Sequence, residues 1–425
     1  MPWRTVLRTS AATWLAPFLV AFVVLLLSDE ITAQTVPGYW PSAMGSASSA
    51  LHFTAPACAT AGAWEGARCT RGGVAHRAPA RSGLGVALPL LVPVLALGAL
   101  GMAVALAVAL SAGLPGAGTP PLGMVPVWLG VLAAHSLAGF LLGRRLPRVL
   151  SAPLALVISF VVAAYPAAME PLWMRHMVDG GMSSCCSLSQ TPGWRAAASA
   201  FVLTLGVITA AAVALTALTR RVRTCLVCTA VAAGLAGSGG LAYGLPADPV
   251  TARPTDALVC AGEAPRVCLW PEAERPAMVR EHAADAQHRL HQAGLPVPAE
   301  LTMAERPGRG SAVLGSGKHL TPYGVRAAVG AALLPTGPPA CADNRQPPAT
   351  APYAAMAVWL ALTAGADPQE AESHYGPEAA AVADRVRRAA RSDQLAWFTQ
   401  NRRALTDCTT RPAPPPAPRG QEAAR

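Results

Sequence analysis

The sequence predicts an all-α polytopic membrane protein with about seven transmembrane helices, followed by a mainly helical, disulfide-bonded domain outside the cytoplasm. Hydrophobic residues make up 52% of the chain and charged residues only 13%, whereas soluble domains usually carry about 25% charge. Several apolar runs reach the roughly 20 residues that a helix needs to cross the hydrocarbon core. After Gly244 the sequence becomes Pro-rich, charged and amphipathic, which indicates a domain boundary.

Seven segments are predicted to span the membrane. Six are long and almost free of charge, as lipid-embedded helices must be: residues 12–28, 84–112, 123–143, 150–169, 196–219 and 224–244. The seventh, residues 43–64, is only weakly hydrophobic but contains no Asp, Glu, Lys or Arg. Its Ser, Thr and His52 side chains are poor partners for lipid, so we expect it inside the bundle, where small residues allow close helix packing.

The arginines of the membrane half favour the odd number of spans. Positively charged loops stay in the cytoplasm, and seven spans place twelve arginines there: Arg4, Arg8, Arg68, Arg71, Arg77, Arg81, Arg144, Arg145, Arg148, Arg220, Arg221 and Arg223. Six spans would leave two of these clusters outside. The prediction is therefore a multi-pass protein of a bacterial plasma membrane, with a cytoplasmic N-terminus and an extracytoplasmic domain over residues 245–408. Reading the N-terminus as a cleaved signal peptide is the alternative.

Four cysteines fall in the predicted outer domain, where an oxidising environment permits disulfides. Cys260, Cys268, Cys341 and Cys408 can pair in three ways. The most local pairing joins Cys260 to Cys268 and Cys341 to Cys408. Cys185 and Cys186 also face outward, and their state stays open because adjacent cysteines rarely pair.

The outer domain is expected to be mainly helical, with an extended or disordered Pro-rich tail over residues 409–425. Helices are predicted over residues 276–293, 353–364 and 378–405. Asp367 followed by Pro368 is typical of a helix N-cap and first turn. A short strand is expected at 257–260 or 267–270.

Motifs for enzyme chemistry are incomplete, so no catalytic, cofactor-binding or metal-binding residue is predicted. Residues 315–318 resemble a phosphate loop, but Ala312 and His319 stand where that motif needs Gly and Ser or Thr. Cys225 and Cys228 have redox-motif spacing but open a predicted span, where packing is the simpler reading. Nucleic acid is excluded as a partner because residues 244–425 hold 19 Lys and Arg against 18 Asp and Glu.

Two histidines inside predicted spans are the polar positions that bear on function. Ionisable groups in a membrane usually face a bundle interior or a cavity. His52 and His135 therefore line a substrate path or make hydrogen bonds that support packing, and the sequence leaves both readings open. The absence of Asp and Glu deep in any span argues against a carrier coupled to protons or sodium through intramembrane carboxylates.

Four short stretches, residues 63–68, 125–128, 143–147 and 267–272, are similar to a family of bacterial multi-span proteins related to ABC-2-type transporter permeases. The resemblance implies a membrane subunit of an export system, as a homo- or heterodimer, with ATP hydrolysis supplied by a separate cytoplasmic subunit. We then expect Arg68, Arg71, Arg77 and Arg81 to form the ATPase-docking loop. The alternative is that these arginines only set topology.

The span count and the outer domain also fit a second class of protein. This is a non-transporting membrane sensor or envelope-assembly protein whose outer domain binds a ligand or a protein. Trp270 beside Cys268 is either a recognition edge for such a ligand or, as we expect, the buried anchor of a small disulfide-closed turn.

Overall fold

The computed structural model divides the chain into two compact units, Met1–Thr251 and Ala252–Arg425, which are described separately. It describes residues 8–73, 82–115, 118–263, 265–306, 308, 311–315, 320–335 and 350–416. Several positions singled out above lie outside the described residues: Arg4, Arg77, Arg81, Cys341, residues 316–319 and residues 417–425. The first unit ends shortly after the change in composition at Gly244.

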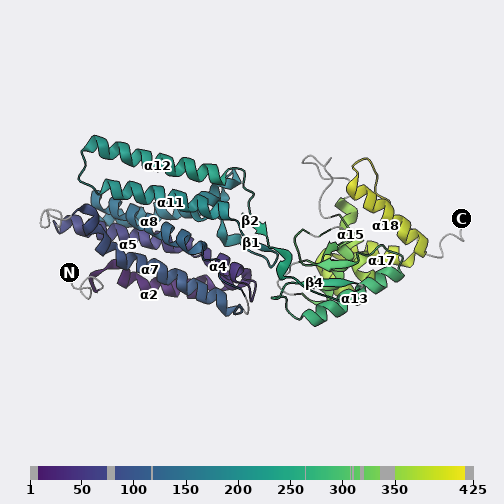
Figure 1. Cartoon of the computed structure of the whole chain (residues 1–425). Helices are drawn as coiled ribbons and strands as arrows, with labels where there is room; N and C mark the ends of the chain where they lie inside the picture. The colour runs from purple at the N-terminus through teal and green to yellow at the C-terminus, as the bar shows by residue number, and fades with distance from the viewer. Residues whose placement is uncertain are drawn as a thin grey trace. The chain divides into compact units, whose positions relative to one another are not determined.

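Long helices lie side by side in the first unit (Figure 1). They are α2 (Ala11–Leu26), α5 (Leu51–Arg71), α7 (Gly83–Ser111), α8 (Met124–Arg145), α9 (Arg148–Ala164), α11 (Trp194–Ala214) and α12 (Arg220–Ala242). Shorter elements connect them: α3 (Ser28–Gln34), α4 (Trp40–Ser48), η1 (Tyr165–Ala168), η2 (Leu172–Arg175), α10 (His176–Asp179), η3 (Met182–Ser184), β1 (Gln190–Pro192) and β2 (Val250–Ala252). Strand β2 pairs with β1.

These long helices alternate in direction, so the bundle has two distinct ends. The end of α5 meets the end of α8, where the Thr70 hydroxyl lies 3.5 Å from the Arg144 carbonyl. At the other end, the Gly38 amide donates to the Gly113 carbonyl at 3.3 Å. We call the first the arginine end, because it collects Arg8, Arg68, Arg71, Arg144, Arg145, Arg220, Arg221 and Arg223. We call the other the loop end.

Five helical segments are long and apolar enough to cross a membrane among the described residues: α7, α8, Val149–Ala168, α11 and α12. Helices α2 and α3, which are bent by 52°, make a sixth if they are counted as one span. The predicted seventh span corresponds to helix α5, which is not among these candidates. Its 21 residues extend about 31 Å at 1.5 Å per residue, but its Ser, Thr, His and small residues lower its hydropathy.

Helix α5 lies inside the bundle, as expected for a weakly hydrophobic segment. Its Gly62 and Gly66 face α8 so closely that an added Cβ would stand 2.3 Å from the Ser136 carbonyl oxygen and 2.1 Å from that of Phe140. Gly139 and Gly143 of α8 meet the backbone of α5 in the same way. Each helix therefore contributes a Gly-xxx-Gly pair, the pattern by which membrane helices approach closely.

The predicted single segment 43–64 is instead two helices, α4 and α5, separated at Ser49 and Ala50. The serine hydroxyls there bond to nearby backbone carbonyls, Ser48 to Met44 at 2.9 Å and Ser49 to Ser46 at 2.7 Å. Such local bonds compete with regular helix geometry. The break places the start of α5, including His52, at the loop end.

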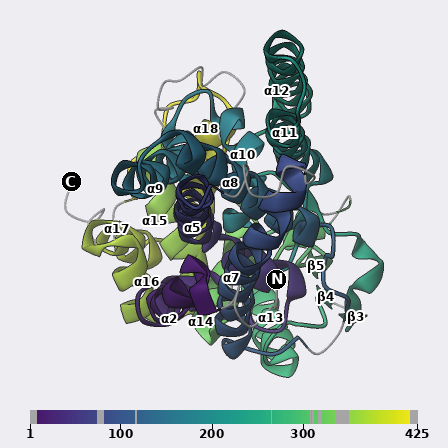
Figure 2. The same ribbon diagram turned by 90° about the vertical axis from the view of Figure 1, so that its left-hand side faces the viewer.

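Helix α12 lies at the edge of the bundle against α11 in both views (Figures 1 and 2). Gly206 and Gly234 pack together, and the Ser199 and Ser238 hydroxyls lie 2.9 Å apart. Most of its remaining surface is exposed, including Leu226 and Leu235. This exposed apolar face is what a helix that contacts lipid requires.

The second unit is mainly helical, as the sequence predicts, and the short strand expected near residues 257–260 or 267–270 is part of a four-stranded sheet. The strands are β3 (Val259–Ala261), β4 (Arg266–Leu269), β5 (Glu300–Thr302) and β6 (Ser311–Val313), hydrogen-bonded in that order. The β3–β4 pair is antiparallel, while β4–β5 and β5–β6 are parallel. Helix α13 (Pro276–Gln292) connects β4 to the parallel β5.

The described part of this unit contains five further helices: α14 (Pro322–Ala331), α15 (Thr350–Thr363), α16 (Pro368–Tyr375), α17 (Pro377–Arg388) and α18 (Arg391–Thr406). Asp367 caps α16 as predicted, since its carboxylate accepts from the Gln369 and Glu370 amides. The segment predicted as one helix over 378–405 is two helices, interrupted at Ala389 and Ala390.

The sheet carries the disulfide between Cys260 and Cys268, which are directly opposed in the β3–β4 register. Trp270 follows β4 and is 1% exposed, so it is the buried anchor expected from the sequence. Its indole N–H donates to the Met303 carbonyl at 3.2 Å. Cys408 is also disulfide-bonded, but Cys341 lies outside the described residues, so their pairing stays a prediction.

Candidate functional site

A cavity of about 800 Å³ opens at the loop end of the first unit. Its walls come from segments far apart in sequence, namely α2 with α3, the α4–α5 junction, α9 and the loop before α11. The described lining residues are Leu27, Glu30, Gln34, Val36, Ser49, His52, Phe53, Phe160, Ala164, Ser183, Cys185, Cys186 and Ser187. The volume lies in the range of small-molecule sites.

His52 and Asp179 form the ion pair beside this cavity. The His52 Nε2 lies 3.3 Å from a carboxylate oxygen of Asp179, and its Nδ1 lies 3.0 Å from the Ser49 carbonyl. Because both ring nitrogens face oxygen acceptors, both contacts are hydrogen bonds only when the ring is protonated. The pair therefore ties the start of α5 to the loop before α11. His52 lines the cavity, while its place in a substrate path stays a prediction.

The loop that carries Asp179 is fixed by its own contacts. The other Asp179 oxygen accepts from the Gly181 amide at 2.7 Å, and the His176 Nε2 donates to the Pro246 carbonyl at 2.7 Å. Burial lowers the pKa of His176, against the opposing effects of that hydrogen bond and of Asp179. A neutral His176 therefore holds the loop at physiological pH.

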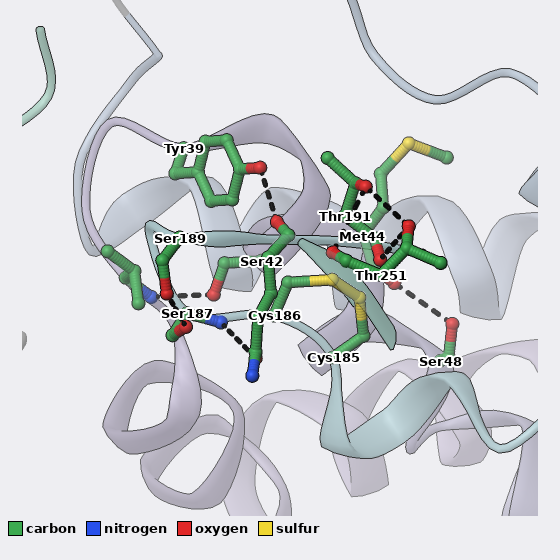
Figure 3. The surroundings of a disulfide bond; sticks show 12 residues. Tyr39, Ser42, Met44, Ser48, Cys185, Cys186, Ser187, Ser189, Thr191 and Thr251 are labelled. Atoms are coloured by element: carbon green, nitrogen blue, oxygen red, sulfur yellow. Dashed lines mark hydrogen bonds between the residues drawn. A yellow bond between two sulfur atoms is a disulfide. The ribbon is translucent and has the colours of Figure 1, made fainter. Parts of the chain in front are cut away.

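Cys185 and Cys186, whose state the sequence leaves open, are joined to each other by a disulfide and are both buried. Figure 3 shows the hydrogen-bonded residues around them. Helix α4 packs directly on this loop, because an added Cβ at Gly45 would stand 2.1 Å from the Cys185 carbonyl oxygen. The disulfide forms part of the cavity wall.

Glu30 supplies the carboxylate of the described cavity lining. It lies on α3, where the Gln34 side chain donates to it at 2.6 Å. The bend between α2 and α3 turns this helix away from the direction of α2. Glu30 lies between the predicted spans 12–28 and 43–64, and no sequence signal marks it, because the bend between α2 and α3 contains no Gly or Pro.

His135 lines a second, mostly apolar cavity of about 350 Å³ between α5, α8, α9 and α11. Its Nδ1 lies 2.6 Å from the Ser159 hydroxyl. His52 and His135 therefore border different cavities, and the two candidate path residues are not brought together. His135 fits the reading of hydrogen-bonded packing between α8 and α9.

The predicted docking loop is only partly described. Arg68 pairs with the buried Glu65 at 2.7 Å and donates to the Thr9 carbonyl, and the Ala11 amide also donates to Glu65 at 3.0 Å. These contacts secure the start of α2 to the end of α5, so Arg68 has a structural role. Arg71 is exposed at the end of α5.

Within the described ranges, no group of three or more His, Cys, Asp or Glu side chains is arranged to hold a metal ion. The cysteines Cys225 and Cys228 are free and exposed on α12, while Cys58 and Cys69 are free and buried on α5. The chemistry of the cavity at the loop end therefore comes from its charged and apolar side chains.

The fold defines an integral membrane protein with several spans and a C-terminal domain of mixed structure. Residues 267–408 match a family described as a domain of unknown function, DUF7224. The match begins in β4 and ends at Cys408. No curated protein and no solved structure is similar to the chain, so the comparisons do not support a relation to ABC-2 permeases.

Proposed function

We propose that this protein is the permease-like membrane subunit of an ABC-2-type export system, working with a separate ATPase. The observation that carries the proposal is the cavity of about 800 Å³ at the loop end of a helical bundle. A transport subunit needs a cavity of this kind, because a solute must bind to the protein, away from lipid and bulk water, before it crosses the membrane. The resemblance at residues 125–128 and 143–147 supports the same class.

The proposed topology has seven spans, with the arginine end in the cytoplasm. Helix α5 supplies the seventh span, since it is long enough and its polar side chains are shielded by α8 and its other neighbours. The loop end, with its cavity, then faces outward. The second unit follows the loop end of α12 and is extracytoplasmic, where disulfides such as Cys260–Cys268 persist.

Arginines at the proposed cytoplasmic end are the proposed contact for the ATPase. Arg68 is excluded because it holds Glu65 and Thr9, which leaves the exposed Arg71 and, later in the sequence, Arg77 and Arg81. We expect the triple variant Arg71→Gln, Arg77→Gln, Arg81→Gln to retain less ATPase. The loss should be roughly tenfold, because each exposed charge pair contributes up to about 1 kcal/mol.

The measurement is MgATP hydrolysis that co-purifies with tagged protein from its native membrane in mild detergent. The matched control neutralises Arg220, Arg221 and Arg223, which lie at the same end on α12. Equal loss in both variants would show that the charges only set topology. Absence of ATPase from the wild-type preparation would overturn the export proposal.

The second candidate is a non-transporting sensor or envelope-assembly protein. The observation that favours it is the separate compact second unit, which has its own sheet, disulfide and buried Trp270. Such a unit can bind a ligand or an envelope protein without any transport by the bundle. Wild-type protein that purifies without ATPase would favour this candidate.

A further inference from the structure

The charges around the cavity are unevenly balanced. Asp179 is paired with His52, whereas the ion pairs among the described residues do not include Glu30. The described lining contains no Lys or Arg. Glu30 therefore gives the cavity a negative charge that its own wall does not neutralise.

The whole loop end carries a net negative charge, as the cavity does. Its carboxylates are Asp29, Glu30, Glu170, Asp179 and Asp248, and its arginines are Arg175 and Arg195. Five acidic groups against the two arginines and the protonated His52 leave a formal charge of −2. Clefts lined by one sign of charge concentrate ligands of the opposite sign, so this end attracts cations and repels anions.

The rest of the wall combines aromatic and aliphatic side chains with uncharged polar ones, Gln34 and three serines. Phe53 and Phe160 line the cavity with ring centroids 6.1 Å apart, and Phe22 continues the row at 4.9 Å from Phe53. Leu27 and Val36 add aliphatic surface. Aromatic rings attract organic cations while accommodating their apolar substituents. A small hydrated metal ion would gain little from such a wall.

We infer that this cavity binds an organic cation with an apolar body, such as a quaternary ammonium or phosphonium compound. Glu30 neutralises the charge, and the phenyl side chains of Phe53 and Phe160 cover the apolar substituents. The His52–Asp179 pair closes one side and keeps Asp179 from competing with Glu30 for the cation. The inference deepens the proposed function. It rests on the proposed topology, which makes the cavity open to the outside of the cell.

The test is equilibrium dialysis of tetraphenylphosphonium against the purified full-length protein, with detergent alone as the blank. Tetraphenylborate has the same shape and apolar surface but the opposite charge. We expect saturable binding of the cation, without competition from the anion. Glu30→Gln should weaken binding about tenfold, the loss of one partly screened charge contact, and Phe160→Leu about threefold.

Asp29→Asn is the matched control, because Asp29 lies on the same helix with the same charge but does not line the cavity. Its affinity should stay close to that of the wild type, because Asp29 acts on the cation only through the screened field of the loop end. Equal weakening by Asp29→Asn and Glu30→Gln, or equal binding of the two probes, would overturn the inference. Cation binding without co-purified ATPase would retain the site and reject the export proposal, whereas ATPase without cation binding would do the reverse.

Discussion

Replacing Gly139 and Gly143 with alanine should separate helices α5 and α8 and destabilise the whole bundle. An added Cβ would stand 2.0 Å from the Ala59 carbonyl oxygen at Gly139 and 1.9 Å from that of Ala63 at Gly143. Backbone cannot move aside as a flexible side chain can. Overpacking costs about 1–3 kcal/mol per site, and both sites disturb one interface.

Thermal exposure of the buried thiols Cys58 and Cys69 on α5 measures this effect directly. The assay uses a thiol-reactive fluorophore with detergent-purified protein, in a background where the exposed Cys225 and Cys228 are serine. Both thiols should react at a lower temperature in the double variant.

The matched control is Gly239→Ala with Gly240→Ala on α12, where an added Cβ meets nothing within 4 Å. Alanine there should be neutral or slightly stabilising, because it favours helix more than glycine does. An unchanged melting profile for Gly139→Ala with Gly143→Ala would contradict the close packing of α5 on α8. The case for α5 as a span would then fall with it.

Trp270→Ala should destabilise the second unit by about 3–5 kcal/mol, the range for removing a large buried aromatic side chain. The indole is buried, and its N–H donates a hydrogen bond to the Met303 carbonyl. The Arg253 guanidinium lies 4.3 Å from the ring centroid and pairs with Glu272 at 3.0 Å. Loss of the ring therefore leaves a cavity and removes the surface on which Arg253 rests.

Pulse proteolysis of the full-length protein in urea measures the stability of this unit alone. The midpoint should fall by roughly 2 M urea, given the typical dependence for a domain of this size. Val259→Ala is the control, since Val259 lies in β3 and is half exposed. A normal midpoint with lost ligand or partner binding would instead assign Trp270 to recognition.

Apolar length was sufficient to predict the lipid-facing helices, because the membrane imposes that length on each of them. Helix α5 was predicted as a span only through charge, since an odd number of crossings places the arginines on one side, and its hydropathy alone does not mark it as one. Its glycines were visible, but their partners in α8 were not, because close approach depends on which faces meet. The break between α4 and α5 could not be predicted, because Ser49 and Ala50 include neither Pro nor Gly.

The cavity could not be predicted, because Glu30, His52, Phe160 and Cys185 are brought together only by tertiary packing. His52 was found through its polarity in a predicted span, whereas Asp179 lies between the predicted spans 150–169 and 196–219, where no pattern marks it as the partner of His52. In the second unit, β5 and β6 are three residues each, too short for an alternating pattern. The interruption between α17 and α18 was hidden by alanine, which favours helix on both sides.

Labelling of the second unit in intact cells tests the central claim, that the loop end and this unit face outward, most directly. The probe is a membrane-impermeant maleimide, added with or without an impermeant reductant, to protein in which Cys225 and Cys228 are replaced by serine. Labelling is measured at four cysteines: Cys260, Cys268, Cys341 and Cys408. Seven spans predict labelling only after reduction, while an added Arg71→Cys stays unlabelled until the membrane is permeabilised. Labelling of the four cysteines only in permeabilised cells, without reductant, would contradict the topology, the position of α5 and the outward cavity.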